Sequence, residues 1–162
     1  VEKRFKIGDW ILVEDIIEGI VEKIGFRSTV IRKFDKSIAI IPNFQFAENA
    51  VINISQTTNW IISWTINLQY DTTVDQLKKV RNEIESYIKT HKDYKPDLGY
   101  AVRVDKFADS SIDMYIRCFT QTDDWDEWLA VKERLAIEIK QIVENNNASF
   151  AFPSQSIYVE KK

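Results

Sequence analysis

GIVEKIGFRSTVIRKFDKSIAIIPNFQFAENAVINIS, residues 19–55, is the stretch that decides the fold. Apolar side chains recur in it with a period of two, which is typical of strands with one buried face in an antiparallel meander. The alternating set is Ile20, Ile24 and Phe26, then Val30, Arg32 and Phe34, then Ile38, Ile40 and Pro42. We expect these strands to close into a small β-barrel.

Turn-forming residues separate the runs. Gly19 and Gly25 stand where a strongly bent strand drops its side chain so that another backbone can approach. Asp35 and Lys36 are predicted to form a tight hairpin turn between two of the strands.

Pro42 ends the meander, because proline has no backbone N–H to donate within a sheet. Asn43 is predicted to be the N-cap of a helical turn from Phe44 to Asn49. One more short strand is expected from Val51 to Ile54.

A polar linker, residues 55–59, divides the chain, and the predicted domains are 1–57 and 58–162. The second domain is predicted to run strand, helix, strand, strand, helix, strand, a ferredoxin-like βαββαβ layer with both helices on one face. Its segments are 60–70, a helix capped by Thr72 or Thr73, 99–107, 112–119, a helix capped by Thr122 or Asp123, and a strand around Ile157–Val159. The fold class is therefore mixed β and α+β, with a small Sm-like (SH3-like) barrel first.

Composition limits the classes of function. The chain is 44% hydrophobic and 12% aromatic, which suffices for real cores, and its net charge of −3 with no basic stripe argues against nucleic acid as a partner. No run approaches the roughly 20 apolar residues needed to cross a bilayer, and no secretory signal opens the chain. We expect a fragment of a longer protein, and the single cysteine fits a reducing compartment.

A catalytic set cannot be assembled from this inventory. His91 is the only histidine and falls at the end of a helix, where the helix dipole favours it. Cys118 shares the apolar side of its strand with Met114 and Ile116 and is interpreted as a core residue. We expect no catalytic, metal or cofactor site, and hence no enzyme.

Two further clusters favour structural interpretations. The acidic residues Asp123, Asp124, Asp126 and Glu127 lack the spacing of a calcium loop and fit helix capping. The tryptophans Trp60, Trp64, Trp125 and Trp128 fall on stripes expected to be buried. Trp10 sits beside a turn, and whether it faces a neighbouring subunit stays open.

The ordered motifs of the chain resemble the small-conductance mechanosensitive channel family. They are FKIGDWI at 5–11, EGIVEKIGFRST at 18–29, Asp35, Pro42-Asn43, Asn53-Ile54-Ser55 and FAFPSQSIYV at 150–159. The hairpin departs from the family pattern, because Lys36 stands where members often have glycine. The resemblance implies structural or assembly roles for Gly8, Asp9, Trp10, Gly19, Thr29, Asp35, Pro42, Asn43 and Asn53.

The same resemblance implies a function. The chain would be the cytoplasmic vestibule, or cage, of a homoheptameric bacterial channel in the cell (inner) membrane, which releases ions and osmolytes on membrane tension during hypo-osmotic shock. Membrane helices would lie upstream of Val1, and no cofactor would be needed. Two alternatives stay open: a free Sm-like ring that binds RNA, and a regulatory module that binds a small ligand.

Overall fold

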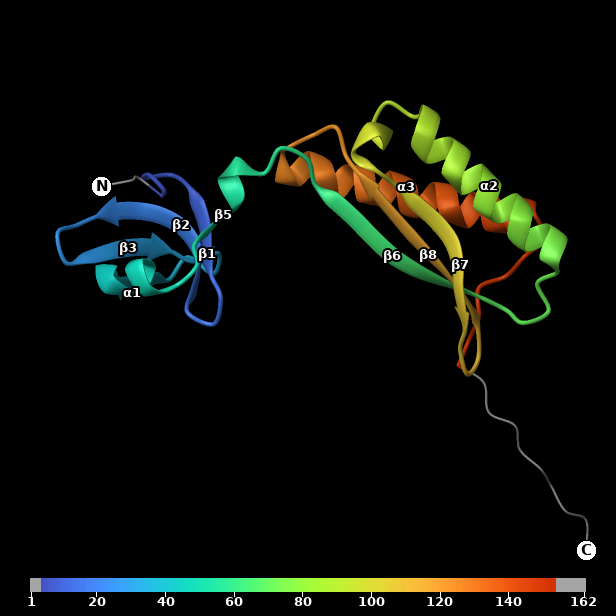
Figure 1. Cartoon of the computed structure of the whole chain (residues 1–162), viewed down its shortest axis with the longest axis horizontal. Coiled ribbons are helices and arrows are strands. Elements are labelled where there is room, and N and C mark those ends of the chain that lie inside the picture. Colours follow the sequence, from blue (N-terminus) through green and yellow to red (C-terminus); the bar gives the residue numbers. More distant parts are fainter. Residues whose placement is uncertain (1–3, 154–162) are drawn as a thin grey trace, which may run out of the picture. The chain divides into compact units, whose positions relative to one another are not determined.

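The computed structural model describes residues 4–153, which form two compact units joined at the Thr57–Thr58 peptide bond (Figure 1). We describe each unit by itself. The strand predicted around Ile157–Val159 lies outside the described residues.

Unit 1 is a five-stranded antiparallel sheet with the strand order β4-β3-β2-β1-β5. The strands are β1 (Trp10–Val13), β2 (Ile17–Ile24), β3 (Ser28–Arg32), β4 (Ile38–Pro42) and β5 (Ile52–Asn53), with the helix α1 (Asn43–Glu48) and the 3-10 turn η1 (Ile54–Gln56). Within residues 4–57 the edge strands β4 and β5 do not pair, so the predicted meander forms but its hydrogen bonding does not close into a barrel. The two-residue β5 pairs with β1 and ends the sheet on that side.

The residues buried in unit 1 are not the alternating set that predicts the strands but the positions between them. The buried core consists of the interleaved positions, together with Phe46 of α1: Ile11, Val13, Ile17, Val21, Ile31 and Phe46. Ile38 and Ile40 point the other way and are 52% and 67% exposed. Both faces of these strands are apolar, so the period predicts the strands but does not tell which face is buried.

Gly19 has the role expected of it. A Cβ at this position would lie 2.5 Å from the backbone oxygen of Arg32 on β3, far inside van der Waals contact. The register of β2 against β3 shifts between Val21 and Lys23, which marks a β-bulge and a sharp local bend. Only glycine therefore lets the backbone of β3 approach β2 so closely at this position.

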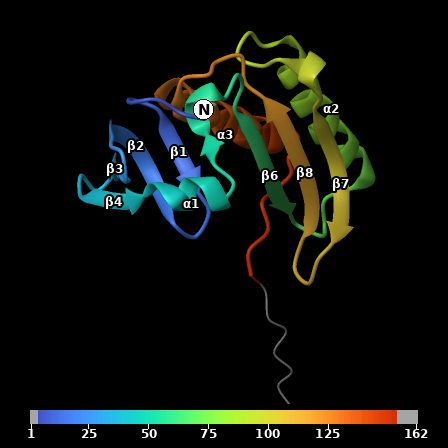
Figure 2. The ribbon, with the colours of Figure 1, turned by 60° about the vertical axis from the view of Figure 1, so that its left-hand side comes forward.

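Unit 2 is a three-stranded antiparallel sheet with the order β6-β8-β7 and two helices on one face (Figure 2). Its elements are β6 (Ile61–Leu68), α2 (Val74–Thr90), the 3-10 turn η2 (Pro96–Leu98), β7 (Ala101–Phe107), β8 (Ile112–Phe119) and α3 (Trp125–Asn145). After α3, the amide of Ala151 donates to Asn67 O (2.8 Å) and Ser149 O accepts from Gln69 N (3.0 Å). The chain thus returns to the free edge of β6, as a ferredoxin-like order requires.

The helix caps match the prediction at one helix and miss it by a residue at the other. Thr73 caps α2, and its reciprocal hydrogen bonds with Gln76 form a complete capping box. Asp124 caps α3, because its Oδ1 accepts from Glu127 N (2.8 Å). Thr122, one of the two predicted caps, instead accepts from Asp124 N (3.1 Å).

The core of unit 2 lies between its sheet and its two helices. The buried stripes of β6, α2, β8 and α3 contribute Ile62, Leu68, Val80, Ile84, Ile88, Met114, Ile116, Cys118, Val131, Leu135, Ile139 and Val143. Trp64 and Trp128 pack against this core, as predicted. Trp60 and Trp125 form an aromatic cluster with Trp128, with ring centroids 4.5–5.5 Å apart. The prediction that Trp125 is buried is wrong, because it is the first residue of α3 and is 39% exposed.

We predict that Gly19→Ala destabilises unit 1 by about 2 kcal/mol, because overpacking at a backbone contact forces the strands apart. Hydrogen exchange of the β2 and β3 amides measures this opening free energy. Lys23→Ala, an exposed change on the same strand, is the control and should stay within about 0.5 kcal/mol. Equal protection in Gly19→Ala and the parent protein would contradict the close-approach argument.

Candidate functional site

The first group of motif residues ties the start of the chain to β5. Asp9 is only 4% exposed, and its Oδ2 accepts from Lys6 N (3.0 Å) and from Asn53 Nδ2 (2.8 Å). Gly8 adopts a φ of +94°, a left-handed conformation that favours glycine, and its amide donates to Val21 O (2.8 Å). These bonds hold the turn that leads into β1.

The second group fixes the β2–β3 turn. Asn43 Nδ2 donates to the carbonyls of Gly25 (2.9 Å) and Phe26 (3.0 Å), and its Oδ1 accepts from Thr29 Oγ1 (2.9 Å). The prediction that Asn43 is an N-cap is wrong, because Pro42 is the cap position and Asn43 is the first residue of α1. Its amide side chain is used for the turn instead, and the turn displays Phe26 at 98% exposure.

The β3–β4 turn forms where it was predicted. Asp35 Oδ1 accepts from the backbone N (2.9 Å) and the hydroxyl (2.6 Å) of Ser37, and these hydrogen bonds lower the pKa of the Asp35 carboxyl. Lys36 takes a φ of +72°, the conformation for which glycine is favoured. The hairpin turn thus forms with lysine in place of glycine, at a small cost in backbone strain.

The side of the unit 1 sheet that points away from the core is here called the outer face. We define it by the apolar side chains of β1 to β4 that point away from the core, which are Trp10, Leu12, Ile20, Val30, Ile38 and Ile40. Trp10 stacks edge-on against Phe34 (5.0 Å) and donates from Nε1 to Glu18 Oε1 (3.0 Å). Glu22 and Arg32 form an ion pair on this face (2.6 Å), which lowers the pKa of the Glu22 carboxyl.

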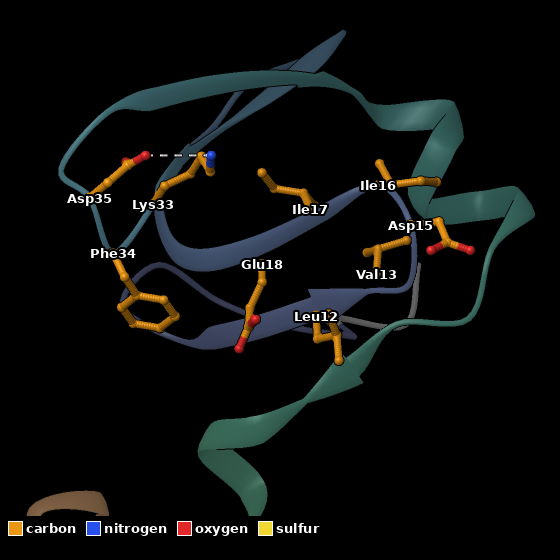
Figure 3. Close-up of a pocket in the computed structure, with 9 residues that line it drawn as sticks. All are labelled: Leu12, Val13, Asp15, Ile16, Ile17, Glu18, Lys33, Phe34 and Asp35. Atoms are coloured by element: carbon orange, nitrogen blue, oxygen red, sulfur yellow. Dashed lines mark ion pairs between the residues drawn. The ribbon is translucent and has the colours of Figure 1, made fainter.

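A shallow groove adjoins the outer face at the turns that follow β1 and β3. Figure 3 shows its lining of apolar side chains with charged groups at the rim, where Lys33 pairs with Asp35 (3.6 Å). The residues are Leu12, Val13, Asp15, Ile16, Ile17, Glu18, Lys33, Phe34 and Asp35. It contains neither a histidine nor a cysteine.

The groups considered for catalysis have structural surroundings. Burial leaves Cys118 only 1% exposed and raises the pKa of its thiol to about 12. His91 ends α2, stacks on Tyr87 (4.8 Å) and accepts at Nδ1 from Asp93 N (3.3 Å). Within residues 4–153 no group of three histidine, cysteine or acidic side chains is placed to hold a metal ion.

Comparisons with known families define the class. Residues 1–56 match the family described as mechanosensitive ion channel, beta-domain, and residues 62–150 match mechanosensitive ion channel MscS, C-terminal. The fold and these matches together place the chain in the class of mechanosensitive ion channels. The chain belongs to the MscS family, a family of channels and not of enzymes.

Individual relatives are similar in sequence to this chain over almost its whole length. An uncharacterized MscS family protein of Aquifex aeolicus (strain VF5) is 38% identical over 99% of this chain and 43% of its own length. The low conductance mechanosensitive channel YnaI of Escherichia coli (strain K12) is 36% identical over 98% of this chain and 46% of its own length. The chain thus spans less than half of these two relatives.

Solved structures share the fold. The crystal structure of Helicobacter pylori MscS in its closed state has a TM-score of 0.82 at 25% identity, covering 99% of this chain and 61% of that one. Arabidopsis thaliana MSL1, determined by cryo-EM, has a TM-score of 0.85 at 21% identity over 93% of this chain and 54% of its own. No helix within residues 4–153 has the length and apolar character to cross a bilayer.

We predict that Asn43→Ala destabilises unit 1 by about 2 kcal/mol, because it removes three side-chain hydrogen bonds at the β2–β3 turn. Asn43→Asp should be more damaging, since it places carboxylate oxygens against the carbonyls of Gly25 and Phe26. The opening free energy from hydrogen exchange of β2 and β3 measures both. Glu48→Ala, an exposed change on α1, is the control, and equal stability of all three variants would refute this role of Asn43.

We also predict that Cys118 does not react with a disulfide reagent in the native protein at about pH 8, because the thiolate is the reactive form and burial suppresses it. Thiol titration in buffer and in concentrated guanidinium chloride checks this, and one thiol should appear only after unfolding. Rapid labelling of the native protein would show that the strand is open to solvent.

Proposed function

We propose that this chain forms the vestibule, or cage, below the pore of a small-conductance mechanosensitive channel, on the cytoplasmic side of the cell (inner) membrane. The observation that carries the proposal is that both halves match MscS-family regions in chain order, with structural similarity to Helicobacter pylori MscS over 99% of the chain. Membrane tension would open pore helices outside this chain. Ions and small osmolytes would then leave through the cage during hypo-osmotic shock.

The outer face of unit 1 supports a homo-oligomer. A sheet that is apolar on both faces is normally covered on both, and large exposed apolar patches mark interaction sites. Ile38 and Ile40 are 52% and 67% exposed in the described part of the single chain. A neighbouring copy that covers them through a heterologous contact generates a closed ring, for which we propose seven subunits.

The cage as proposed selects solutes without a chemical step. Its openings would restrict solutes by size, and charged side chains near the path would favour ions of one sign. The motif residues from Gly8 to Asn53 would act in assembly by holding the turns that shape the subunit surface.

We predict that Ile40→Glu lowers the mass of the purified full-length protein assembly, since burying a carboxylate at a subunit contact is unfavourable. Light scattering coupled to size-exclusion chromatography measures the mass. Ile40→Val preserves the apolar surface and Lys36→Glu reverses a charge on the β3–β4 turn, and both should assemble like the parent. An unchanged mass for Ile40→Glu would show that the outer face is not the contact.

The function itself is tested by survival of osmotic downshock. Expression of the full-length protein in a bacterial host that lacks its own mechanosensitive channels should restore survival. A protein that reaches the membrane but gives no protection would contradict the proposed function.

A further inference from the structure

The sheet of unit 2 has an open face, on the side opposite α2 and α3 (Figure 2). Its side chains come from alternate positions of the three strands, and the register places them in rows. We define the open face as Ser63 and Thr65 on β6, Tyr115 and Arg117 on β8, and Ala101 and Arg103 on β7. Polar side chains dominate this face, which suits contact with water.

Arg117 lies on the open face, on the middle one of the three strands, and its Nε has no hydrogen-bond partner among the described residues. It is half-buried on the middle strand, and its Nε is shielded from solvent with no hydrogen-bond acceptor in the part of the chain that the structure describes. A shielded donor without an acceptor is costly, and it therefore needs an explanation.

The other arginines of unit 2 behave differently. Arg81 pairs with Glu85 (3.0 Å), Arg103 approaches the same carboxylate (3.7 Å), and Arg134 pairs with Asp93 (2.8 Å). Arg117 forms no ion pair within residues 4–153. Its guanidinium is thus the one in unit 2 whose charge no described carboxylate balances.

The side chains next to Arg117 in the sheet do not neutralise its charge. Ser63 and Ala101, its register partners on both sides, are small, and the Ser63 hydroxyl is within hydrogen-bond distance of Tyr115 Oη (3.1 Å). Asp113, the acidic residue further along β8, accepts from Ser111 Oγ and Asn67 Nδ2 (2.7 Å each). This carboxylate is therefore already satisfied.

We propose that Arg117 faces the water-filled path of the cage and raises the permeability of the channel to small anions. This inference rests on the proposed function. A fixed positive charge beside a confined aqueous path raises the local anion concentration, and a ring repeats that charge in every subunit. Its register partners Ser63 and Ala101 are small, and the half-buried side chain keeps part of its surface exposed, where hydrated anions can approach.

The test is the reversal potential of the full-length channel under a KCl gradient, recorded from excised patches under suction. Arg117→Gln should lower the chloride-to-potassium permeability ratio by about twofold, because each subunit loses one fixed charge. Arg117→Lys should keep the ratio near that of the parent. Ala101→Glu, which places a carboxylate beside Arg117, should lower the ratio as well and serves if Arg117→Gln does not fold.

The dependence on salt separates an electrostatic role from a packing role. The effect of Arg117→Gln should shrink between about 0.1 M and 1 M salt, where the Debye length falls from about 10 to about 3 Å. Arg103→Gln is the control on the neighbouring strand β7, and its ratio should change less because its guanidinium approaches Glu85 of α2, which already offsets its charge.

Several results would overturn the inference. They are an unchanged ratio in Arg117→Gln and Ala101→Glu, a ratio in Arg117→Lys as low as in Arg117→Gln, or a loss of assembly mass with an unchanged ratio. The last would mean that Arg117 pairs with a carboxylate of a second copy. Absence of suction-activated current in the parent protein would instead contradict the proposed function on which the inference rests.

Discussion

A sheet with apolar side chains on both faces is the constraint on which the account of unit 1 depends. One chain buries only the inner set, which includes Ile11, Val21 and Ile31, against Phe46 of α1. The outer set is less completely buried, and two of its members, Ile38 and Ile40, are exposed. Since burial of apolar surface is the main favourable term in folding and association, the same strands that build the core also favour a partner. The exposed apolar side chains therefore support the proposed assembly of several copies.

Polar side chains in unit 1 serve chiefly to hold turns. Asn43 reaches across to the β2–β3 turn, Asp9 connects the first turn to Asn53, and Asp35 closes the β3–β4 turn. Each bond is worth only about 1 kcal/mol net, yet each fixes the position of a loop that the strands alone would leave undetermined. The motif residues therefore act through geometry, which fits a protein whose proposed work is mechanical and electrostatic.

The sequence carried the order and type of the elements well. Period-two runs located the strands of both units, and glycine at position 19 marked the close approach of the β2 and β3 backbones. Helical spacing located α2 and α3, and the capping box at Thr73 was visible as a local pattern. These features depend on residues close together in the chain, so the sequence pattern alone predicts them.

What the sequence did not reveal depends on distant contacts. The buried face of unit 1 could not be chosen, because both phases are apolar. Asn43 looked like a cap because its partners, 14 and more residues away, are invisible in a local pattern. Whether β4 and β5 pair depends on strands distant in the chain, and the sequence wrongly suggested a closed barrel. The surroundings of Arg117 emerged only once β6 and β7 were placed beside β8.

The central claim is that this chain belongs to a channel gated by membrane tension. Patch-clamp recording from liposomes that contain the purified full-length protein tests it most directly. The account predicts stepwise currents that appear under suction and vanish when the suction is released. Patches that hold verified protein but stay silent up to the pressure that ruptures the membrane would contradict it, as would currents that ignore pressure.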